Sequence, residues 1–292
     1  MVHVVAMADT TSGTDVADSG SISLLPVKTW NPLLTGSLSA VLPGAGQAYT
    51  GHYIKAGSFL ALEVITALVA RSWYNAEKVR NTNADFYEQS SLITSGKTDS
   101  LSELEKAALW RFDAFGARYS MYNSLSWMIG GYIYNVLDAV ACSKFFVSDE
   151  EKSPAKAAWL SAIPGLGLGQ LYNGAPGKAG MIFMTQMSLG VIAVNEHRLM
   201  RKAEAGITAL NRLNDSTTVE VVEEYKQDWE FRQGVAFRNR NTYLWYSLFF
   251  YVYGILDAIV DAHLHDYPKK IRAYPDLVAH QSAAGITLEY IF

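Results

Sequence analysis

Four long apolar stretches alternate with polar segments along the chain. They run over about Tyr53–Trp73, Tyr122–Phe146, Gly177–Val194 and Thr242–His263. A helix needs ~20 mostly apolar residues to cross a bilayer, and the second and fourth stretches meet this length. The first and third are weaker because Glu63 and Gln186 interrupt them. The pattern predicts four transmembrane helices, two of which need further support.

An internal repeat supplies that support. Residues 39–57 read SAVLPGAGQAYTGHYIKAG, and residues 161–180 read SAIPGLGLGQLYNGAPGKAG. Each copy precedes one apolar stretch, and a later apolar run, 123–140 or 241–260, carries a single aspartate, Asp138 or Asp257. Because a repeat at a fixed period indicates one structural unit used twice, a weak span gains credibility from its duplicate. The sequence therefore predicts an all-α integral membrane protein made of two tandem repeats.

A shorter apolar piece precedes the first span of each repeat. Leu33–Val41 and Ala157–Ile163 are both followed by a Pro-Gly pair, which breaks a helix. They are too short to cross, so each is predicted to be a half-helix that dips into the membrane or lies at its surface. A turn then leads into the span. The predicted turn residues are Pro43, Gly44, Gly46, Gln47, Tyr49 and Gly51, with Pro164, Gly165, Gly169, Gln170, Tyr172 and Gly174 in the second copy.

Polar inserts at 74–120 and 195–240 separate the two spans of each repeat. Both have helical composition on either side of a central breaker, Thr94–Lys97 or Asn214–Thr217. Each insert is therefore predicted to extend its spans as an antiparallel hairpin outside the membrane, with ~20 residues adding ~30 Å to each helix. Aromatic side chains are expected to pack these hairpins together: Phe86, Tyr87, Trp110, Tyr225, Trp229 and Phe231.

The domain boundaries follow from this pattern. Residues 1–30 are interpreted as a disordered tail or the remainder of a signal peptide, 31–147 as the first repeat and 148–156 as a linker. Residues 157–267 form the second repeat, and 268–292 a C-terminal tail whose weak alternation suits a short strand or a docked segment. Positive charges near the span ends nearly balance on the two sides, so the orientation in the membrane stays open.

Composition narrows the functional classes. Half of the residues are hydrophobic and 18% are charged, against a usual ~25%. The net charge of -4 gives no reason to expect binding to nucleic acid. The single cysteine, Cys142, allows neither an intramolecular disulfide nor a cysteine-based metal site. The histidines are scattered and no serine lies in a G-x-S-x-G phrase, so we expect no enzyme and no cofactor.

The candidate functional residues are the polar side chains within the apolar stretches: Glu63, Asp138, Gln186 and Asp257. An ionisable residue in a membrane helix is costly and suggests a functional site. One interpretation is a proton or cation relay in which Glu63, Asp138 and Asp257 face a shared interior. The other is that each aspartate bonds to the turn of its own repeat. The position of the aspartates near the ends of their spans favours the second interpretation.

Two further motifs carry weaker signals. Asp257, Asp261 and His265 fall on one helix face and have the side chains of metal ligands. The first repeat lacks these residues, so a metal site would occur in one copy only. We therefore expect no metal, and Asp257, Asp261 and His265 remain weak candidates. The glycine-rich turns lack the strand-to-helix context and the Gly-Lys-Ser/Thr ending of a phosphate loop.

The motif LPGxGQxYxGxxxKxG, followed by a span and later by an aspartate-bearing span, resembles a family of uncharacterised bacterial membrane proteins. That family is common in Bacteroidota and is classified only as a domain of unknown function; its units are similar to the two-helix TM-two domain. The resemblance covers roughly 33–147 and 154–267 and is closer in the second copy, through Asp257-Ala258-x-Val260-Asp261-Ala262-His263-Leu264. It implies a multi-pass protein of the bacterial inner membrane and no particular activity.

The function we expect is that of a non-enzymatic membrane scaffold or accessory subunit. Such a protein would sit in the lipid bilayer and dock a protein partner, or a second copy of itself, through its extramembrane hairpins. The alternative is a small transporter or channel component that uses Glu63, Asp138 and Asp257.

Overall fold

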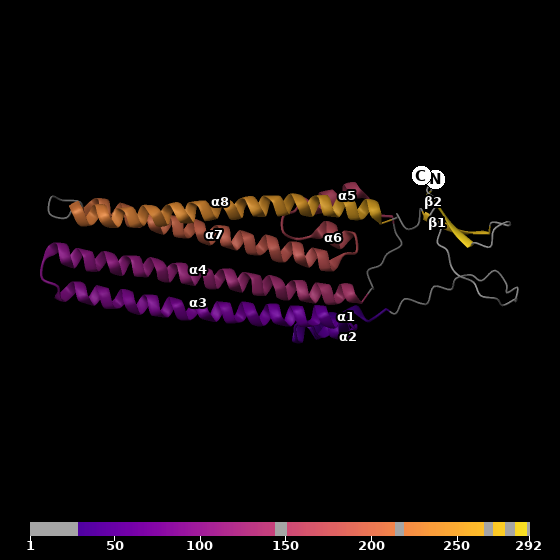
Figure 1. Ribbon diagram of the computed structural model, residues 1–292, viewed down its shortest axis with the longest axis horizontal. Coiled ribbons are helices and arrows are strands. Elements are labelled where there is room, and N and C mark those ends of the chain that lie inside the picture. The colour runs from indigo at the N-terminus through magenta and orange to yellow at the C-terminus, as the bar shows by residue number, and fades with distance from the viewer. Residues whose placement is uncertain (1–28, 144–150, 214–218, 266–270, 278–283, 291–292) are drawn as a thin grey trace.

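Four long helices run side by side and alternate in direction along the chain (Figure 1). They are α3 (Tyr53–Ile93), α4 (Lys97–Cys142), α7 (Pro176–Leu213) and α8 (Val219–Leu264). The computed structural model describes residues 29–143, 151–213, 219–265, 271–277 and 284–290. At ~1.5 Å per residue, a helix as long as α4 measures ~69 Å, more than twice the thickness of a bilayer core.

Four short helices gather at one end of the long ones (Figure 1). They are α1 (Pro32–Val41), α2 (Ala45–Tyr49), α5 (Pro154–Ser161) and α6 (Leu168–Tyr172). Asn31 and Ser153 cap α1 and α5, accepting hydrogen bonds from Leu33 N and Lys156 N, and proline follows each cap because its missing N–H is not needed there. The two short apolar helices therefore begin and end close to the predicted limits.

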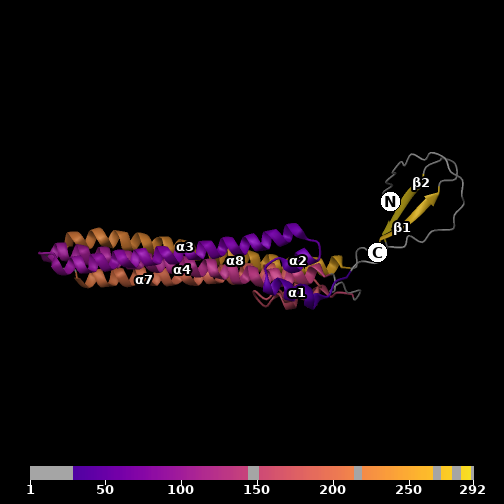
Figure 2. The same cartoon turned by 90° about the horizontal axis from the view of Figure 1, so that it is seen from below.

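The C-terminal tail contains the described strands of the chain. Strands β1 (Ile271–Leu277) and β2 (Ala284–Tyr290) pair antiparallel, with Ile271 opposite Tyr290 (Figure 2). The all-α prediction is thus confirmed for the described residues up to His265, and the short strand expected as one alternative for the tail is present as a pair of strands. The weak alternation of apolar and polar residues in the tail was the signal for these strands.

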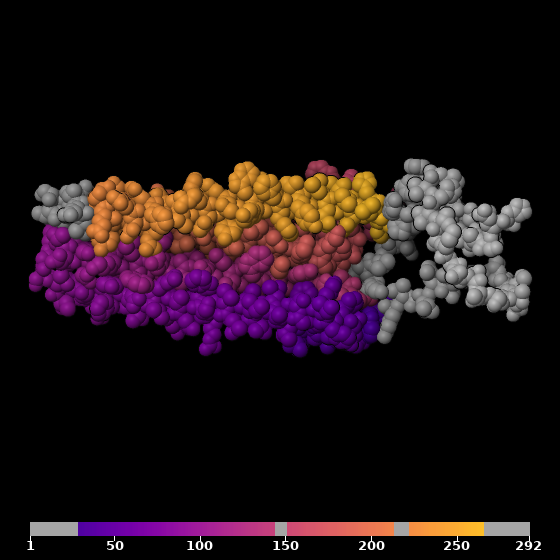
Figure 3. Space-filling view, viewed as in Figure 1, coloured from indigo at the N-terminus to yellow at the C-terminus, as the bar shows by residue number. Residues whose placement is uncertain are grey.

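The long helices form an open layer rather than a closed bundle. α3 packs on α4, α4 on α7, and α7 on α8, while α4 and α8 touch at only a few points. Figure 3 shows α3 along one long edge of the molecule and α8 along the other. Each edge helix consequently leaves much of its surface uncovered.

Large apolar side chains cover the uncovered surfaces of α3 and α8 in the half nearest the short helices. Those at least 41% exposed include Leu60, Val64, Ile65, Leu68 and Val69 on α3, and Leu244, Trp245, Phe249, Val252, Leu256 and Val260 on α8. Within the most apolar windows of these two helices only 11% of the residues are buried, against 50% for α7. We call this surface the apolar belt.

Three helices in the described part of the chain are long and apolar enough to cross a membrane: α3, α7 and α8. This property is typical of a membrane protein. α4, for which a span over Tyr122–Phe146 was predicted, is not among them, because its apolar stretch includes Asn135, Asp138 and several glycines and tyrosines. Residues 144–146 of that predicted span lie outside the described residues.

A hydrophobic core lies in the other half of the layer, far from the short helices. It joins Leu101 and Phe112 of α4, Ala203 and Leu210 of α7, and Val222, Tyr225 and Trp229 of α8. The rings of Phe112 and Trp229 meet edge to face at 5.4 Å. The burial of Tyr225 and Trp229 confirms their predicted packing role, whereas Phe86 and Phe231 are 65% and 69% exposed, so that prediction is wrong for them. We call this half the distal half.

Glu105 is buried in this distal core. It is 8% exposed, and the indole Nε1 of Trp229 donates to its Oε2 at 3.4 Å. Burial raises the pKa of Glu105, because desolvation penalises the carboxylate and the bond from Trp229 only partly offsets it. Glu105 therefore destabilises the folded protein whenever it is ionised.

We expect Glu105→Gln to stabilise the protein at neutral pH. Because the pKa is raised in the folded state, the free energy of unfolding is highest below the unfolded-chain pKa, ~4.3, and falls as pH rises through the folded-state pKa. The gain from the substitution should therefore vanish near pH 4. Thermal unfolding of detergent-solubilised protein across a pH series measures it. Glu224→Gln, at an exposed position on α8, is the control and should show no such pH-dependent gain.

Candidate functional site

The first glycine-rich turn lies against the C-terminal part of α4. Gly44 has φ 86°, and its N–H donates to Asn135 Oδ1 at 2.9 Å. A Cβ at Gly44 would lie 2.3 Å from the carbonyl oxygen of Ala56, so only glycine fits there. The N–H of Gly46 donates to Ser39 Oγ at 2.9 Å. The helix break thus leaves backbone N–H groups free of helical hydrogen bonds, and they donate to side chains of α1 and α4.

Gln47 is the centre of this turn and is completely buried. Its Oε1 accepts from Ser39 Oγ at 2.8 Å, and its Nε2 donates to Asn135 O at 2.8 Å and to Asp138 Oδ2 at 3.2 Å. The Nδ2 of Asn135 donates in turn to Ser39 O at 3.0 Å. A buried polar network is stabilising only when its members are satisfied, and here both ends of the Gln47 amide are.

Asp138 also binds a lysine of the same turn region. The Nζ of Lys55 lies 2.9 Å from Asp138 Oδ1, with the Asp138 side chain 7% exposed and that of Lys55 52% exposed. The carboxylate therefore has a hydrogen-bond donor on one oxygen and a cation on the other. Lys55 therefore neutralises Asp138.

The second turn forms corresponding contacts with α8. Gln170 Nε2 donates to Gly254 O at 2.7 Å and to Asp257 Oδ2 at 3.4 Å. Lys178 Nζ lies 2.9 Å from Asp257 Oδ1 and 2.7 Å from Asp261 Oδ2. Asn173 Nδ2 donates to Ala258 O at 2.7 Å. Each aspartate is thus paired with the glutamine and the lysine of the turn that packs against its helix.

The two turns differ in how many of their buried polar atoms have a hydrogen-bond partner. Asn135 of α4 has no counterpart on α8, where Gly254 supplies only its carbonyl oxygen. Among the described residues, Ser161 Oγ, Gln170 Oε1 and Asn173 Oδ1 are buried without a hydrogen-bond partner. The second copy has two more residues between Pro-Gly and Gly-Gln, and Gly167, with φ 60°, occupies the left-handed position before α6 that Gly44 occupies before α2. The insertion changes the turn but keeps its left-handed entry.

Of the remaining predicted turn residues, Gly169 is buried against Ser161 and Ala157, and the others lie closer to the surface of the same end. Gly51 and Gly174 have φ 87° and 76°, as tight turns require, and Gly165 has φ 80°. The ring of Tyr49 meets Trp30 edge to face at 4.8 Å. Tyr172 Oη accepts from Ser153 N at 3.0 Å. These contacts fasten the turns to the residues that precede α1 and α5.

Glu63 and Gln186 lie elsewhere. Glu63 faces α4, where a Cβ on Gly131 would lie 3.3 Å from its Oε1, and this oxygen has no partner among the described residues. Gln186 links α7 to α8, donating to Ser247 O at 2.9 Å and accepting from Ser247 Oγ at 3.0 Å. The structure therefore separates the four predicted polar residues into four sets of neighbours and brings no two of them into contact.

Two of the three weak metal-site candidates take part in a different interaction, whereas His265 Nε2 is buried without a hydrogen-bond partner among the described residues. Asp257 and Asp261 both bind Lys178, which also belongs to the second turn. No group of three or more His, Cys, Asp or Glu side chains that would hold a metal ion occurs among the described residues.

Sequence reasoning missed several residues of these networks: Ser39, Asn135 and Gly167, and Lys55 and Lys178 as ion-pair partners. One signal for them was available, because Ser39 and Lys55 recur as Ser161 and Lys178 in the second copy of the phrase.

The comparison with known protein families gives one match. Residues 150–288 match a family of unknown function (DUF5683). The match spans slightly less than half of the 292 residues and includes the second turn, α7 and α8. No curated protein and no solved structure matches the chain. The similarity supports the expected resemblance to an uncharacterised family, while the Bacteroidota origin and the repeat motif stay predictions.

We expect Gly44→Ala to destabilise the first turn strongly. A positive φ costs an L-residue ~1–2 kcal/mol, and the clash with the Ala56 carbonyl adds ~1–3 kcal/mol. Gly51→Ala is the matched control, since Gly51 has the same φ but nothing within 4 Å of its Cβ position, and it should lose only ~1–2 kcal/mol. Thermal unfolding of both variants in detergent measures the difference; equal losses would contradict the packing argument.

Proposed function

We propose that the protein is a non-enzymatic scaffold or accessory subunit of the bacterial inner membrane, integrated by its apolar belt. In this proposal the distal half stands outside the bilayer and docks a protein partner. The observation that carries the proposal is the pairing of each aspartate with the glutamine and lysine of its adjacent turn. Carboxylates held this way fix the geometry of the chain, and Asp138 and Asp257 are not free to share a relay with Glu63.

Membrane integration is supported by the apolar belt. A soluble monomer rarely exposes contiguous apolar patches beyond a few hundred Å². The exposed large apolar side chains of this half run from Tyr53 to Val69 on α3 and from Leu244 to Leu264 on α8, close to the ~20 residues that a bilayer core requires. Lys55 and Lys178 lie at one limit of the belt, and Arg71 and Arg240 at the other. Lysine and arginine at these positions can extend their charged ends to the two membrane surfaces while their aliphatic parts stay in contact with the apolar region.

Duplication is supported by the matched contacts. In each turn a glycine with positive φ precedes a five-residue helix, a buried glutamine donates to a carbonyl oxygen of a long helix, and a lysine binds an aspartate one turn further along that helix. We infer two tandem repeats, each with a half-helix, a turn and a two-span hairpin that extends outside the membrane.

The docking role is supported by the distal half. Its core joins side chains of α4, α7 and α8, so both hairpins are held in one packed unit. Apolar side chains remain exposed on it, including Phe86, Leu92, Ile93 and Phe231. These residues lie beyond the arginines that end the belt. Exposed apolar residues on a packed platform outside the lipid are suited to contact another protein.

Cysteine labelling tests the membrane placement. Ile65 and Val79 are 58% and 61% exposed on the same helix, α3. In a Cys142→Ser background, Val79→Cys in intact membranes should react with a water-soluble maleimide. Ile65→Cys should react only after the protein is unfolded in denaturing detergent, because lipid covers it. Equal labelling of the two positions in native membranes would contradict integration by the belt.

Shortening the hairpins tests the docking role. Residues 82–111 and 205–230 are each replaced by a short Gly-Ser turn, cutting both hairpins while leaving the two glycine-rich turns in place. The shortened protein should stay in the membrane fraction and lose the proteins that co-purify with the full chain. A variant carrying Phe86→Ser alone serves as the matched control for a local surface change. An unchanged set of co-purifying proteins after shortening would refute the docking role.

A further inference from the structure

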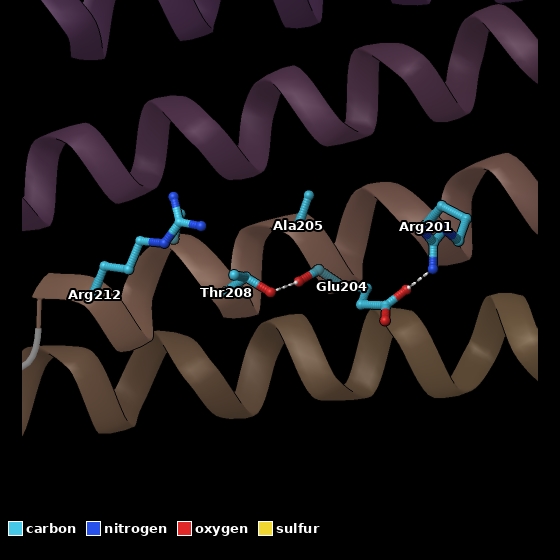
Figure 4. Close-up of a pocket in the computed structure, with 6 residues that line it drawn as sticks. Arg201, Glu204, Ala205, Thr208 and Arg212 are labelled. Atoms are coloured by element: carbon cyan, nitrogen blue, oxygen red, sulfur yellow. Dashed lines mark hydrogen bonds and ion pairs between the residues drawn. The ribbon is translucent and has the colours of Figure 1, made fainter.

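The outward face of α7 carries a regular stripe of residues. Its members are separated alternately by four and three positions: Met187, Val191, Val194, Arg198, Arg201, Ala205, Thr208 and Arg212. All are exposed or half-buried, and they line two shallow depressions of about 470 and 370 Å³, the second shown in Figure 4. Alternating spacings of three and four are typical of a seam that packs against another helix. We call this stripe the α7 seam.

A second stripe with the same spacing lies on α8. It consists of Glu223, Gln227, Glu230, Gly234, Phe237, Asn241, Leu244 and Leu248, all exposed or half-buried. We call it the α8 seam. Neither seam has a described partner helix, since α8 is an edge of the layer and the α7 seam points away from the distal core.

The two seams are level with each other along the layer. The antiparallel register of α7 and α8 is fixed by Lys178 with Asp257, by Gln186 with Ser247, and by Gly206, whose Cβ position lies 2.6 Å from the ring of Trp229. This register places Arg212 level with Glu223, Thr208 with Gln227, and Met187 with Leu248. Both seams are apolar in the belt. Outside it the α7 seam becomes charged at Arg198, level with Phe237, and the α8 seam at Glu230, level with Ala205.

The charged parts of the seams have opposite signs. The α7 seam carries Arg198, Arg201 and Arg212, and the α8 seam carries Glu223 and Glu230, flanked by exposed Glu224 and Asp228. Within the chain Arg201 lies 2.7 Å from Glu204, and Lys226 lies 3.7 Å from Glu223. Arg212 has no ion pair among the described side chains. Exposed pairs contribute little individually, so these groups are available to an intermolecular partner.

We propose that two copies of the chain associate side by side, with the α7 seam of each against the α8 seam of the other. The proposal rests on the membrane placement proposed above, because two copies inserted in the same direction are related by a two-fold axis along the bilayer normal. Such an axis keeps every residue at its height, so Arg212 of each copy meets Glu223 of the other, and the apolar residues of the two seams in the belt meet each other. The contact occurs twice, as a closed two-fold interface requires.

The seams fit a second copy for physical reasons. Inside lipid, apolar side chains gain little from association unless small residues allow close packing. Gly190 lies beside the α7 seam with open space at its Cβ position. Outside the belt, the small side chains of Ala205 and Thr208 let a partner helix approach the seam closely. The charges outside the lipid then set register and direction, as charged positions flanking a coiled-coil seam do.

Crosslinking between differently tagged copies tests the interface. Both copies carry Cys142→Ser; one adds Thr208→Cys and the other adds Gln227→Cys. Co-expression and mild oxidation in native membranes should give mixed-tag dimers about tenfold more often than same-tag dimers, because a disulfide forms only between Cβ atoms ~4 Å apart. Placing the two cysteines on separate chains excludes an intramolecular bond. Thr82→Cys, exposed on α3, replaces Thr208→Cys in the control and should give only background crosslinking.

Charge reversal provides the second arm. Arg212→Glu in both copies places carboxylates opposite the second copy's Glu223 and should lower the crosslinking yield about tenfold, since like charges at an interface are strongly unfavourable. A copy with Arg212→Glu mixed with a copy with Glu223→Arg restores both contacts and should recover the yield. Mixed-tag crosslinking no greater than with Thr82→Cys, or yields insensitive to charge, would overturn the proposal. Labelling of Ile65→Cys in the same membranes separates this failure from a failure of membrane integration.

Discussion

Wherever the chain stops being helical beside a long helix, its backbone amides need partners inside the protein. This requirement shapes the end of the molecule where α1, α2, α5 and α6 gather. At the first turn the N–H groups of Gly44 and Gly46 find Asn135 and Ser39, and Gln47 links them to Asp138. Lys55 then completes the set by neutralising the carboxylate. Removing any one of these partners leaves a buried polar group unsatisfied, which costs ~1–3 kcal/mol.

The same requirement is met less completely at the second turn. Gln170 reaches a backbone carbonyl and Asp257, but its Oε1 and Ser161 Oγ have no described partner. Lys178 instead gains a second carboxylate, Asp261, where the first copy has Cys142. The first turn therefore depends on amide hydrogen bonds and the second more on charge. The two related sequences thus form similar turns that are stabilised by different proportions of hydrogen bonds and ion pairs.

The open layer has the larger functional consequence. A closed bundle would bury the apolar side chains of α3 and α8, whereas a row of helices leaves them outside. In the belt this exposure suits lipid. In the distal half the core of α4, α7 and α8 closes one side of the layer and leaves the α7 seam uncovered on the other. Both proposals, docking of a protein partner and association of two copies of the chain, use surfaces that this packing leaves exposed.

The sequence alone determined the helices, their breaks and the correspondence of the two turns, because apolar periodicity, Pro-Gly pairs and repeated phrases are local signals. It also indicated that each aspartate would bond to its adjacent turn. Only the tertiary structure decided that Lys55 and Lys178 are the counter-ions, that Glu63 and Gln186 lie apart, and that Phe86 and Phe231 face outward while Trp229 is buried. These outcomes depend on which helices become neighbours and in what register. Contacts between side chains far apart in the sequence determine which helices pack together and in what register, and helical periodicity alone does not predict these contacts.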